Sequence, residues 1–200
     1  NTRVLFLFAH QDDELFIYTK LEEHIERGDS LLIVWLAKSY QRGEKYEKKR
    51  VEESRRFFTS IGVDSSQLIF LGFPDSHTHE YIDEIHDILS KVVSEFNPGL
   101  AYVHAYEGGH IDHDIANLIL SHIHDQSEMS FPIIEFPVYS AYDLAGIYPF
   151  KMRNYPPSMD TYCKKLSKSE YKEILDAWRI YKSQHFPLDI YMRFQGTRKG

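Results

Sequence analysis

Short apolar segments alternate with longer amphipathic segments along most of this chain, and this alternation restricts the fold more than any other feature. The apolar segments are rich in strand-forming residues and cover 4–9, 31–37, 68–71, 100–104 and 132–138. Amphipathic stretches with helical periodicity cover 14–27, 44–61, 80–96, 112–125 and 168–183. Near-continuous apolar strands joined by helical crossovers indicate a parallel sheet whose two faces are both covered. The sequence therefore predicts an α/β fold, a three-layer α/β/α sandwich around a Rossmann-like, mostly parallel sheet.

The 200 residues are expected to form one domain, 1–200, because an apolar content of 42% supplies a sufficient core at this size. The regular pattern fades between residues 139 and 167, a region rich in tyrosine that also holds the Pro156-Pro157 pair. Loops of this length often form lids or binding loops. An irregular surface loop whose own aromatic residues pack together is an equally good interpretation of this region.

The charge of the chain argues against nucleic acid as a partner. The formal net charge is -7, and phosphate neutralisation needs a basic face that this composition does not supply. The single cysteine, Cys163, cannot form an internal disulfide, and no apolar run approaches the roughly 20 residues of a membrane-spanning helix. We therefore expect no transmembrane segment in this chain and a cytoplasmic location, with export, peripheral membrane association and the oligomeric state left open.

Two short clusters of metal-binding residue types lie about a hundred residues apart. They are Ala9-His10-Gln11-Asp12-Asp13-Glu14 and Gly109-His110-Ile111-Asp112-His113. Each follows a predicted strand, and open α/β sheets place their sites at the carboxyl ends of strands. Histidine and aspartate are also ligands that zinc accepts. A single histidine near carboxylates is usually a solvated surface residue, but two such clusters behind strands predict a metalloenzyme.

A catalytic zinc site needs three protein ligands and leaves one position open for water. His10, Asp13 and His113 supply two imidazoles and a carboxylate, so we predict these three as the ligands. His110 is spaced i, i+3 from His113 on the same helix face, which leaves it facing the substrate. Zinc is the expected cofactor, although iron, cobalt or another divalent transition metal suits the same ligand types.

The remaining polar residues of the two clusters fit the steps of amide hydrolysis. Asp12 is free to act as the general base that takes a proton from the attacking water. His110 is predicted to stabilise the oxyanion and to protonate the leaving amine, with Asp112 orienting its ring. Glu14 is expected to buttress the turn or to start the following helix.

The two clusters resemble the hallmark segments of the LmbE-like (PIG-L) superfamily of metal-dependent de-N-acetylases, which are A-H-P-D-D-E after the first strand and a later G-H-P-D-H. The resemblance gives the residues the same roles as above. Gln11 and Ile111 replace the two prolines, which relaxes the fixed φ of each turn but removes no ligand. Members mostly remove the N-acetyl group from an N-acetylglucosamine unit. The resemblance therefore implies a hydrolase, an N-deacetylase whose partner is an N-acetylated amino sugar or glycoconjugate.

Three further segments are similar to family motifs. They are Arg50-Val51-Glu52-Glu53 for R-x-x-E, Leu71-Gly72-Phe73-Pro74-Asp75 for L-G-[FY]-x-D and, more weakly, Tyr181-Lys182-Ser183-Gln184 for Y-x-S-Q. The resemblance implies that Arg50 and Asp75 contact the substrate. From the residues alone, a helix-surface salt bridge of Arg50 with Glu53 or Glu47, and an ordinary turn at Asp75, are equally good interpretations.

Two other functions compete with hydrolysis. The first is a non-catalytic carbohydrate-binding or scaffold protein on the same fold, and its support is the loss of proline at Gln11 and Ile111. The second is an α/β phosphohydrolase or nucleotide-binding domain. It has less support, because the chain has neither a G-x-x-x-x-G-K-[ST] loop nor a G-x-G-x-x-G fingerprint after the first strand.

Overall fold

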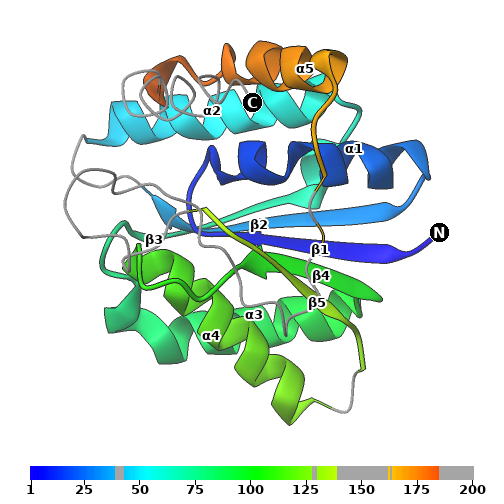
Figure 1. Ribbon diagram of the computed structural model, residues 1–200. Coiled ribbons are helices and arrows are strands. Elements are labelled where there is room, and N and C mark those ends of the chain that lie inside the picture. Colours follow the sequence, from blue (N-terminus) through cyan, green and yellow to red (C-terminus); the bar gives the residue numbers. More distant parts are fainter. Residues whose placement is uncertain (39–42, 128–129, 139–161, 163, 185–200) are drawn as a thin grey trace.

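Five parallel strands form the sheet at the centre of the structure (Figure 1). The computed structural model describes residues 1–38, 43–127, 130–138, 162 and 164–184. The strands are β1 (Arg3–Phe8), β2 (Ser30–Lys38), β3 (Leu68–Pro74), β4 (Leu100–His104) and β5 (Ile133–Phe136). Their order across the sheet is β3-β2-β1-β4-β5, and each neighbouring pair runs parallel. The predicted parallel sheet is confirmed.

Helices cover both faces of this sheet (Figure 1). One face carries α1 (Tyr18–Glu26), α2 (Glu44–Ser60) and α5 (Lys168–Trp178), and the other carries α3 (Ile82–Phe96) and α4 (Ile111–Gln126). Short 3-10 turns connect several of these elements: η1 (Asp13–Ile17), η3 (Ser65–Gln67), η4 (Thr78–Tyr81) and η6 (Lys182–Gln184). The three-layer α/β/α architecture is therefore also confirmed.

The central strand β1 is an unbroken run of apolar residues because both of its faces are buried in hydrophobic cores. Val4, Phe6 and Phe8 belong to the core under α1, α2 and α5, whereas Leu5 and Leu7 belong to the core formed with α3 and α4. All five side chains are fully buried. Burying one such side chain contributes roughly 1.5–3 kcal/mol, so this strand anchors the sheet from both sides.

Some element ends differ from those predicted. The stretch 14–27 begins as the turn η1 and becomes α-helical only at Tyr18, and the stretch 168–183 leaves the α-helix after Trp178. Beyond that point Tyr181 turns into the core, where it is almost fully buried, so the chain departs from the helix axis. Most of the predicted irregular region 139–167 lies outside the described residues. Within the described ranges, every helix is too short or too polar to span a membrane.

The strand order reverses direction between β1 and β4. From β1 the chain moves outward through β2 and β3, and then returns to form β4 on the opposite side of β1. The loops that follow β1 and β4 therefore lead away to opposite faces of the sheet. Open α/β sheets bind their ligands at such a reversal, outside the carboxyl ends of the strands. In this chain the two clusters of candidate metal ligands follow these two strands.

Candidate active site at the ends of β1 and β4

The loop after β1 is folded back on itself by the side chain of Asp13. Its Oδ2 accepts a hydrogen bond from the backbone N–H of His10 at 2.7 Å. Asp12 has a φ of 113°, which lies in the left-handed region that residues other than glycine rarely adopt. The side-chain amide of Gln11, in the position of the family's proline, donates to the carbonyl of Ala37 at 3.3 Å. Hydrogen bonds therefore stabilise the turn after β1, where the family's proline would restrict the backbone conformation.

The second cluster forms the start of helix α4. His110 is the N-cap residue, and its Nδ1 accepts the backbone N–H of Asp112 at 3.2 Å. Ile111 follows at the first helical position, where proline is also favoured, so its replacement of proline leaves the helix start in place. Asp114 accepts two backbone N–H groups from the loop before the helix, at 3.0 and 3.1 Å. These bonds fix the loop that carries the cluster.

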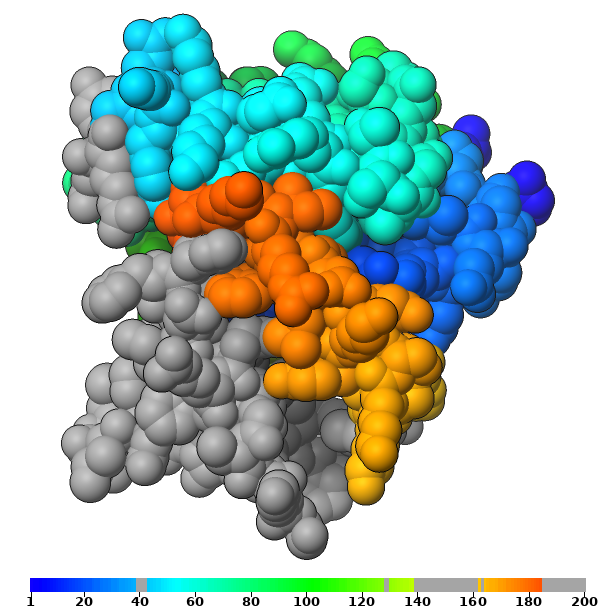
Figure 2. Space-filling view, turned by 90° about the horizontal axis from the view of Figure 1, so that it is seen from above, coloured from blue at the N-terminus to red at the C-terminus, as the bar shows by residue number. Residues whose placement is uncertain are grey.

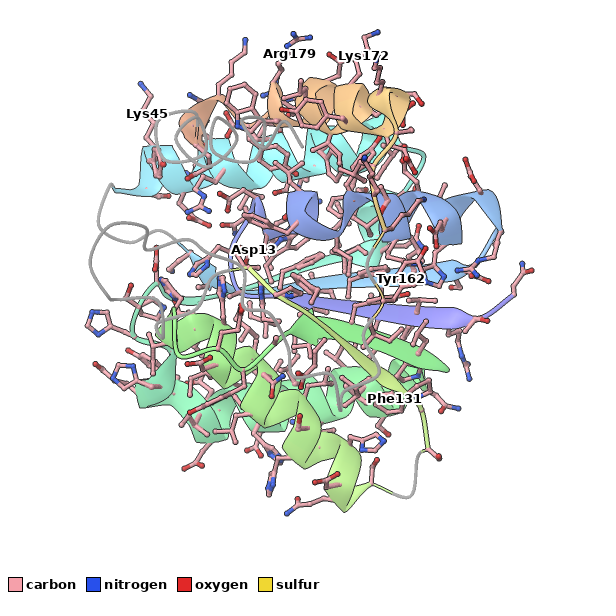
Figure 3. All side chains as sticks on the ribbon, viewed as in Figure 1. Asp13, Lys45, Phe131, Tyr162, Lys172 and Arg179 are labelled. Atoms are coloured by element: carbon pink, nitrogen blue, oxygen red, sulfur yellow. The ribbon has the colours of Figure 1, made fainter. Side chains whose placement is uncertain are left out.

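The three predicted metal ligands lie beside one another at the carboxyl edge of the sheet, where Figure 3 labels Asp13. His10 Nδ1 lies 3.6 Å from Asp13 Oδ2, and His113 Nε2 lies 3.5 Å from Asp13 Oδ1. The centroids of the two imidazole rings are 5.3 Å apart, and all three residues are buried. Two imidazoles and a carboxylate form a donor set whose chemistry fits zinc. The donor atoms close enough together to hold one ion include those of His10, His110 and His113 and those of Asp13, His104 and His113, so the predicted set draws on both groups.

Negative charge surrounds His10. Its Nε2 lies 2.9 Å from Asp112 Oδ2 and 3.4 Å from Asp75 Oδ1, while Asp13 flanks its other nitrogen. Burial lowers the pKa of His10, but the hydrogen bonds to Asp112, Asp13 and Asp75 outweigh burial and raise the pKa well above its usual value. The three carboxylates around His10 therefore create a negative environment that favours a positive charge beside this ring.

Sequence reasoning missed one residue of this site, His104, which is the last residue of β4. Its Nε2 lies 3.1 Å from both Asp13 Oδ2 and the backbone nitrogen of Ala9. The ring stacks on His113 with centroids 3.8 Å apart and an interplanar angle of 15°. Burial lowers the pKa of His104 to about 4, which keeps the imidazole neutral. The signal in the sequence is a histidine that ends an apolar strand, as His104 does.

Asp12 lies beside the ligands and pairs with an arginine from α2. Arg50 Nη2 donates to Asp12 Oδ1 at 3.0 Å and to the carbonyl of Gln11 at 2.5 Å. Burial raises the pKa of Asp12 to about 7, against the opposing charge of Arg50 and with the help of the like charges of Asp13 and Glu14. This carboxyl group is therefore poised to exchange a proton near neutral pH.

Asp112 contacts His10 more closely than it contacts His110. Its Oδ2 lies 2.9 Å from His10 Nε2 but 3.9 Å from His110 Nδ1. The carboxylate also accepts the hydroxyl of Thr78 at 2.6 Å and the backbone N–H of Ser76 at 2.7 Å. Although burial raises the pKa of Asp112, the hydrogen bonds from His10 and Thr78 hold it well below its usual value. Asp112 is thus a fixed anion that orients the first predicted ligand.

His110 is the most exposed histidine of this site. Its side chain is 26% exposed, and its Nε2 lies 4.0 Å from Asp75 Oδ1. Burial and the charge of His10 lower the pKa of His110 to about 4. Because Nδ1 accepts the backbone N–H of Asp112, the proton of the neutral ring sits on Nε2. His110 therefore presents a hydrogen-bond donor to the site.

Asp75 reaches the same site from the end of β3, and its side chain is 24% exposed. Part of its carboxylate is accessible beside the buried ligands. The structure thus brings the eight predicted site residues to one edge of the sheet: His10, Asp12, Asp13, Arg50, Asp75, His110, Asp112 and His113.

Comparisons with known proteins identify a family for this chain. The model of the PIG-L family, described as GlcNAc-PI de-N-acetylase, matches residues 5–124, which include both clusters. A search of curated protein sequences gave no match.

Solved structures share the fold. A deacetylase from the biosynthesis pathway of teicoplanin superposes with a TM-score of 0.73 at 17% identity, covering 94% of this chain and 86% of its own. The N,N'-diacetylchitobiose deacetylase from Pyrococcus horikoshii gives 0.69 at 19% identity, covering 98% and 74%. A conserved protein from Thermus thermophilus gives 0.66 at 16% identity, covering 96% and 85%.

Identities this low establish the fold alone, whereas the family match spans more than half of the sequence. The chain belongs to the PIG-L family of GlcNAc-PI de-N-acetylases.

Proposed function

We propose that this protein is a zinc-dependent N-deacetylase that removes the N-acetyl group from an N-acetylglucosamine-type sugar or glycoconjugate. The observation that carries the proposal is the position of Asp12, whose carboxylate is held by Arg50 next to the candidate ligands His10, Asp13 and His113. A base with a pKa near the working pH transfers protons efficiently. The family and the deacetylases that share this fold support the substrate class.

His10, Asp13 and His113 would hold the zinc ion or another divalent transition metal. The bound metal supplies a Lewis acid that polarises the amide carbonyl and lowers the pKa of water. Asp112 keeps the His10 ring in place through Nε2, and His104 contacts the Asp13 carboxylate. Partners of this kind fix the direction of each ligand and raise its affinity for metal.

Protons move between water, Asp12 and the leaving nitrogen. Asp12 takes a proton from water as the water oxygen bonds to the carbonyl carbon, while His110 donates a hydrogen bond from Nε2 to the developing oxyanion. Since Nδ1 of His110 accepts the backbone N–H of Asp112, its ring has a single N–H to offer, and that N–H is used at the oxyanion. The proton on Asp12 therefore passes to the nitrogen as the C–N bond breaks, which assigns to Asp12 a step expected from His110. The products are acetate and a free amino sugar.

Asp75 and Arg50 complete the proposed site. Asp75, whose side chain is partly exposed, is placed to accept a hydrogen bond from a hydroxyl group of the sugar beside the reacting amide. Arg50 donates hydrogen bonds from Nη2 to the Asp12 carboxylate and to the Gln11 carbonyl. We therefore propose that Arg50 acts mainly by holding the general base Asp12, and not by contacting the substrate directly.

Acetate release from a panel of N-acetylhexosamines and N,N'-diacetylchitobiose tests the proposal on the purified, zinc-loaded protein. Wild-type protein is expected to release acetate and free amine in equal amounts. Asp12→Asn is expected to lower kcat by about 10²–10⁴-fold while retaining zinc, because the base is lost but the ligands remain. Folded, zinc-loaded protein that releases no acetate from the whole panel contradicts the proposal. Sugar binding without turnover would instead support the non-catalytic carbohydrate-binding alternative.

A further inference from the structure

Glu14 collects hydrogen bonds from four separate parts of the chain. It is fully buried, although a carboxylate is costly to remove from water unless its oxygens are satisfied. Oε1 accepts the hydroxyl of Ser54 at 3.1 Å and that of Tyr181 at 2.5 Å. Oε2 accepts the indole N–H of Trp35 at 3.2 Å and the backbone N–H of Asp12 at 2.9 Å. One rigid carboxylate therefore joins Tyr181 to the peptide of Asp12.

The peptide of Asp12 needs such support. Its left-handed φ of 113° is strained for a residue with a side chain, and strain of this kind persists only where surrounding contacts enforce it. Glu14 holds the Asp12 N–H, while Arg50 holds the preceding carbonyl and the Asp12 carboxylate. The direction of the Asp12 carboxylate thus depends on the orientation of Glu14.

Tyr181 belongs to a segment, residues 181–184, that we call the C-terminal hook. Figure 2 shows the C-terminal elements in orange lying along α2 in cyan. The hook is fastened to α2 at two points. Ser183 donates to Glu53 through both its backbone N–H and its hydroxyl, and Gln184 donates to the Tyr46 hydroxyl at 2.9 Å. The Tyr181 ring packs on Phe57 with centroids 5.7 Å apart. This anchoring fixes where the Tyr181 hydroxyl meets Glu14.

We propose that Tyr181 is a positioning residue for the general base: its hydroxyl orients the Glu14 carboxylate, which in turn holds the strained peptide of Asp12. The C-terminal hook is thereby a working part of the site, although it lies outside residues 5–124, which match the family model. The inference rests on the proposed function, because it takes Asp12 as the base.

Tyr181→Phe tests this inference, since it removes the hydroxyl and keeps the ring against Phe57. The matched control is Tyr102→Phe. Tyr102 is also buried, and its hydroxyl bonds His24 Nε2 at 3.0 Å, away from Glu14. Both variants lose one buried hydroxyl bond, so both are expected to lower the melting temperature by similar amounts. Only Tyr181→Phe is expected to lower kcat, by about ten- to a hundredfold, with KM and zinc content unchanged.

A second readout is independent of activity. Amide hydrogen exchange of the Asp12 N–H, followed by NMR, is expected to accelerate in Tyr181→Phe and to remain as in wild type in Tyr102→Phe, because the first change loosens its acceptor. Should Tyr181→Phe not fold, Ser54→Ala removes the other donor to Oε1 and gives the same comparison.

Unchanged Asp12 exchange in a folded variant overturns the inference even if the wild-type protein proves inactive. An active wild-type protein whose kcat falls equally in Tyr181→Phe and Tyr102→Phe also overturns it. Failure of the wild-type protein to release acetate counts against the proposed function instead, so the two failures are distinguishable.

Discussion

The carboxylate of Asp112 lies 2.9 Å from Nε2 of His10, which joins the two sequence clusters through a direct hydrogen bond. A carboxylate that holds the second nitrogen of a metal-binding imidazole fixes the tautomer of the ring and makes it a better ligand. Asp112 is therefore expected to support the proposed metal site, in addition to its place beside His110.

Asp112→Asn is expected to weaken zinc binding about 10–100-fold, because an amide orients His10 less strongly than an anion does. Competition with a chromogenic chelator measures the affinity. Asp125→Asn, on the exposed end of α4, serves as the control and is expected to bind zinc as the wild type does. An Asp112→Asn protein with unchanged zinc affinity and a reduced kcat would show that Asp112 acts through His110.

His110→Ala is expected to lower kcat by about 10²–10³-fold, since it removes the donor to the oxyanion. Zinc content is expected to stay at the wild-type level, because His110 is outside the proposed ligand set. Metal analysis of the purified variant, together with steady-state kinetics, checks both parts. Loss of zinc from this variant would contradict the division of roles among the histidines.

His104→Phe is expected to reduce zinc affinity about tenfold while it preserves much of the stacking on His113. The reason is that Asp13 loses the neighbour that lies 3.1 Å from its Oδ2. Chelator competition again gives the affinity, and His122→Phe on the surface of α4 provides the control. Equal affinities for the two variants would exclude a role for His104 in holding Asp13.

The pH profile is expected to report the ionisation of Asp12. Asp12 works as a base only when deprotonated, so activity is present above its pKa and is lost as the pH falls through it. The pKa is raised to about 7 without metal, and the positive charge of zinc lowers it, which places the acid limb of kcat/KM below pH 7.

Arg50→Gln is expected to move this acid limb to higher pH by roughly 1–3 units, because Arg50 lowers the pKa of Asp12. Arg56→Gln, which removes an exposed charge from the same helix, is expected to leave the limb in place. A limb that does not move in Arg50→Gln would mean that another group controls it.

The layered fold and the meeting of the two clusters follow from the sequence for a physical reason. Apolar strands with helical crossovers allow few arrangements, and the carboxyl ends of parallel strands share one edge. His10, Asp13 and His113 are therefore predicted at the same edge of the sheet. His104 is harder to find, because its contact with Asp13 depends on β4 lying directly beside β1, and periodicity does not determine strand order.

Side-chain directions at the start of α4 are also beyond sequence reasoning. Asp112 is close to His110 in sequence, yet the helix turns its carboxylate toward His10 and Thr78. The departure of the chain from the helix at Trp178 is similar: the amphipathic pattern continues, but Tyr181 turns inward to meet Glu14. In both cases a partner distant in sequence outweighs the local pattern.

The contact between Glu14 and Tyr181 joins residues 167 positions apart. Contacts of such long range form slowly, since the entropy of closing a long loop is lost before any bond compensates for it. The ribosome makes the first strand and its turn early. The general base that follows this strand is held in its working orientation only after the C-terminal hook has docked. Nascent or proteolytically shortened chains that lack the C-terminal hook would lose the Tyr181 hydroxyl that holds Glu14, and we expect them to turn over substrate less efficiently.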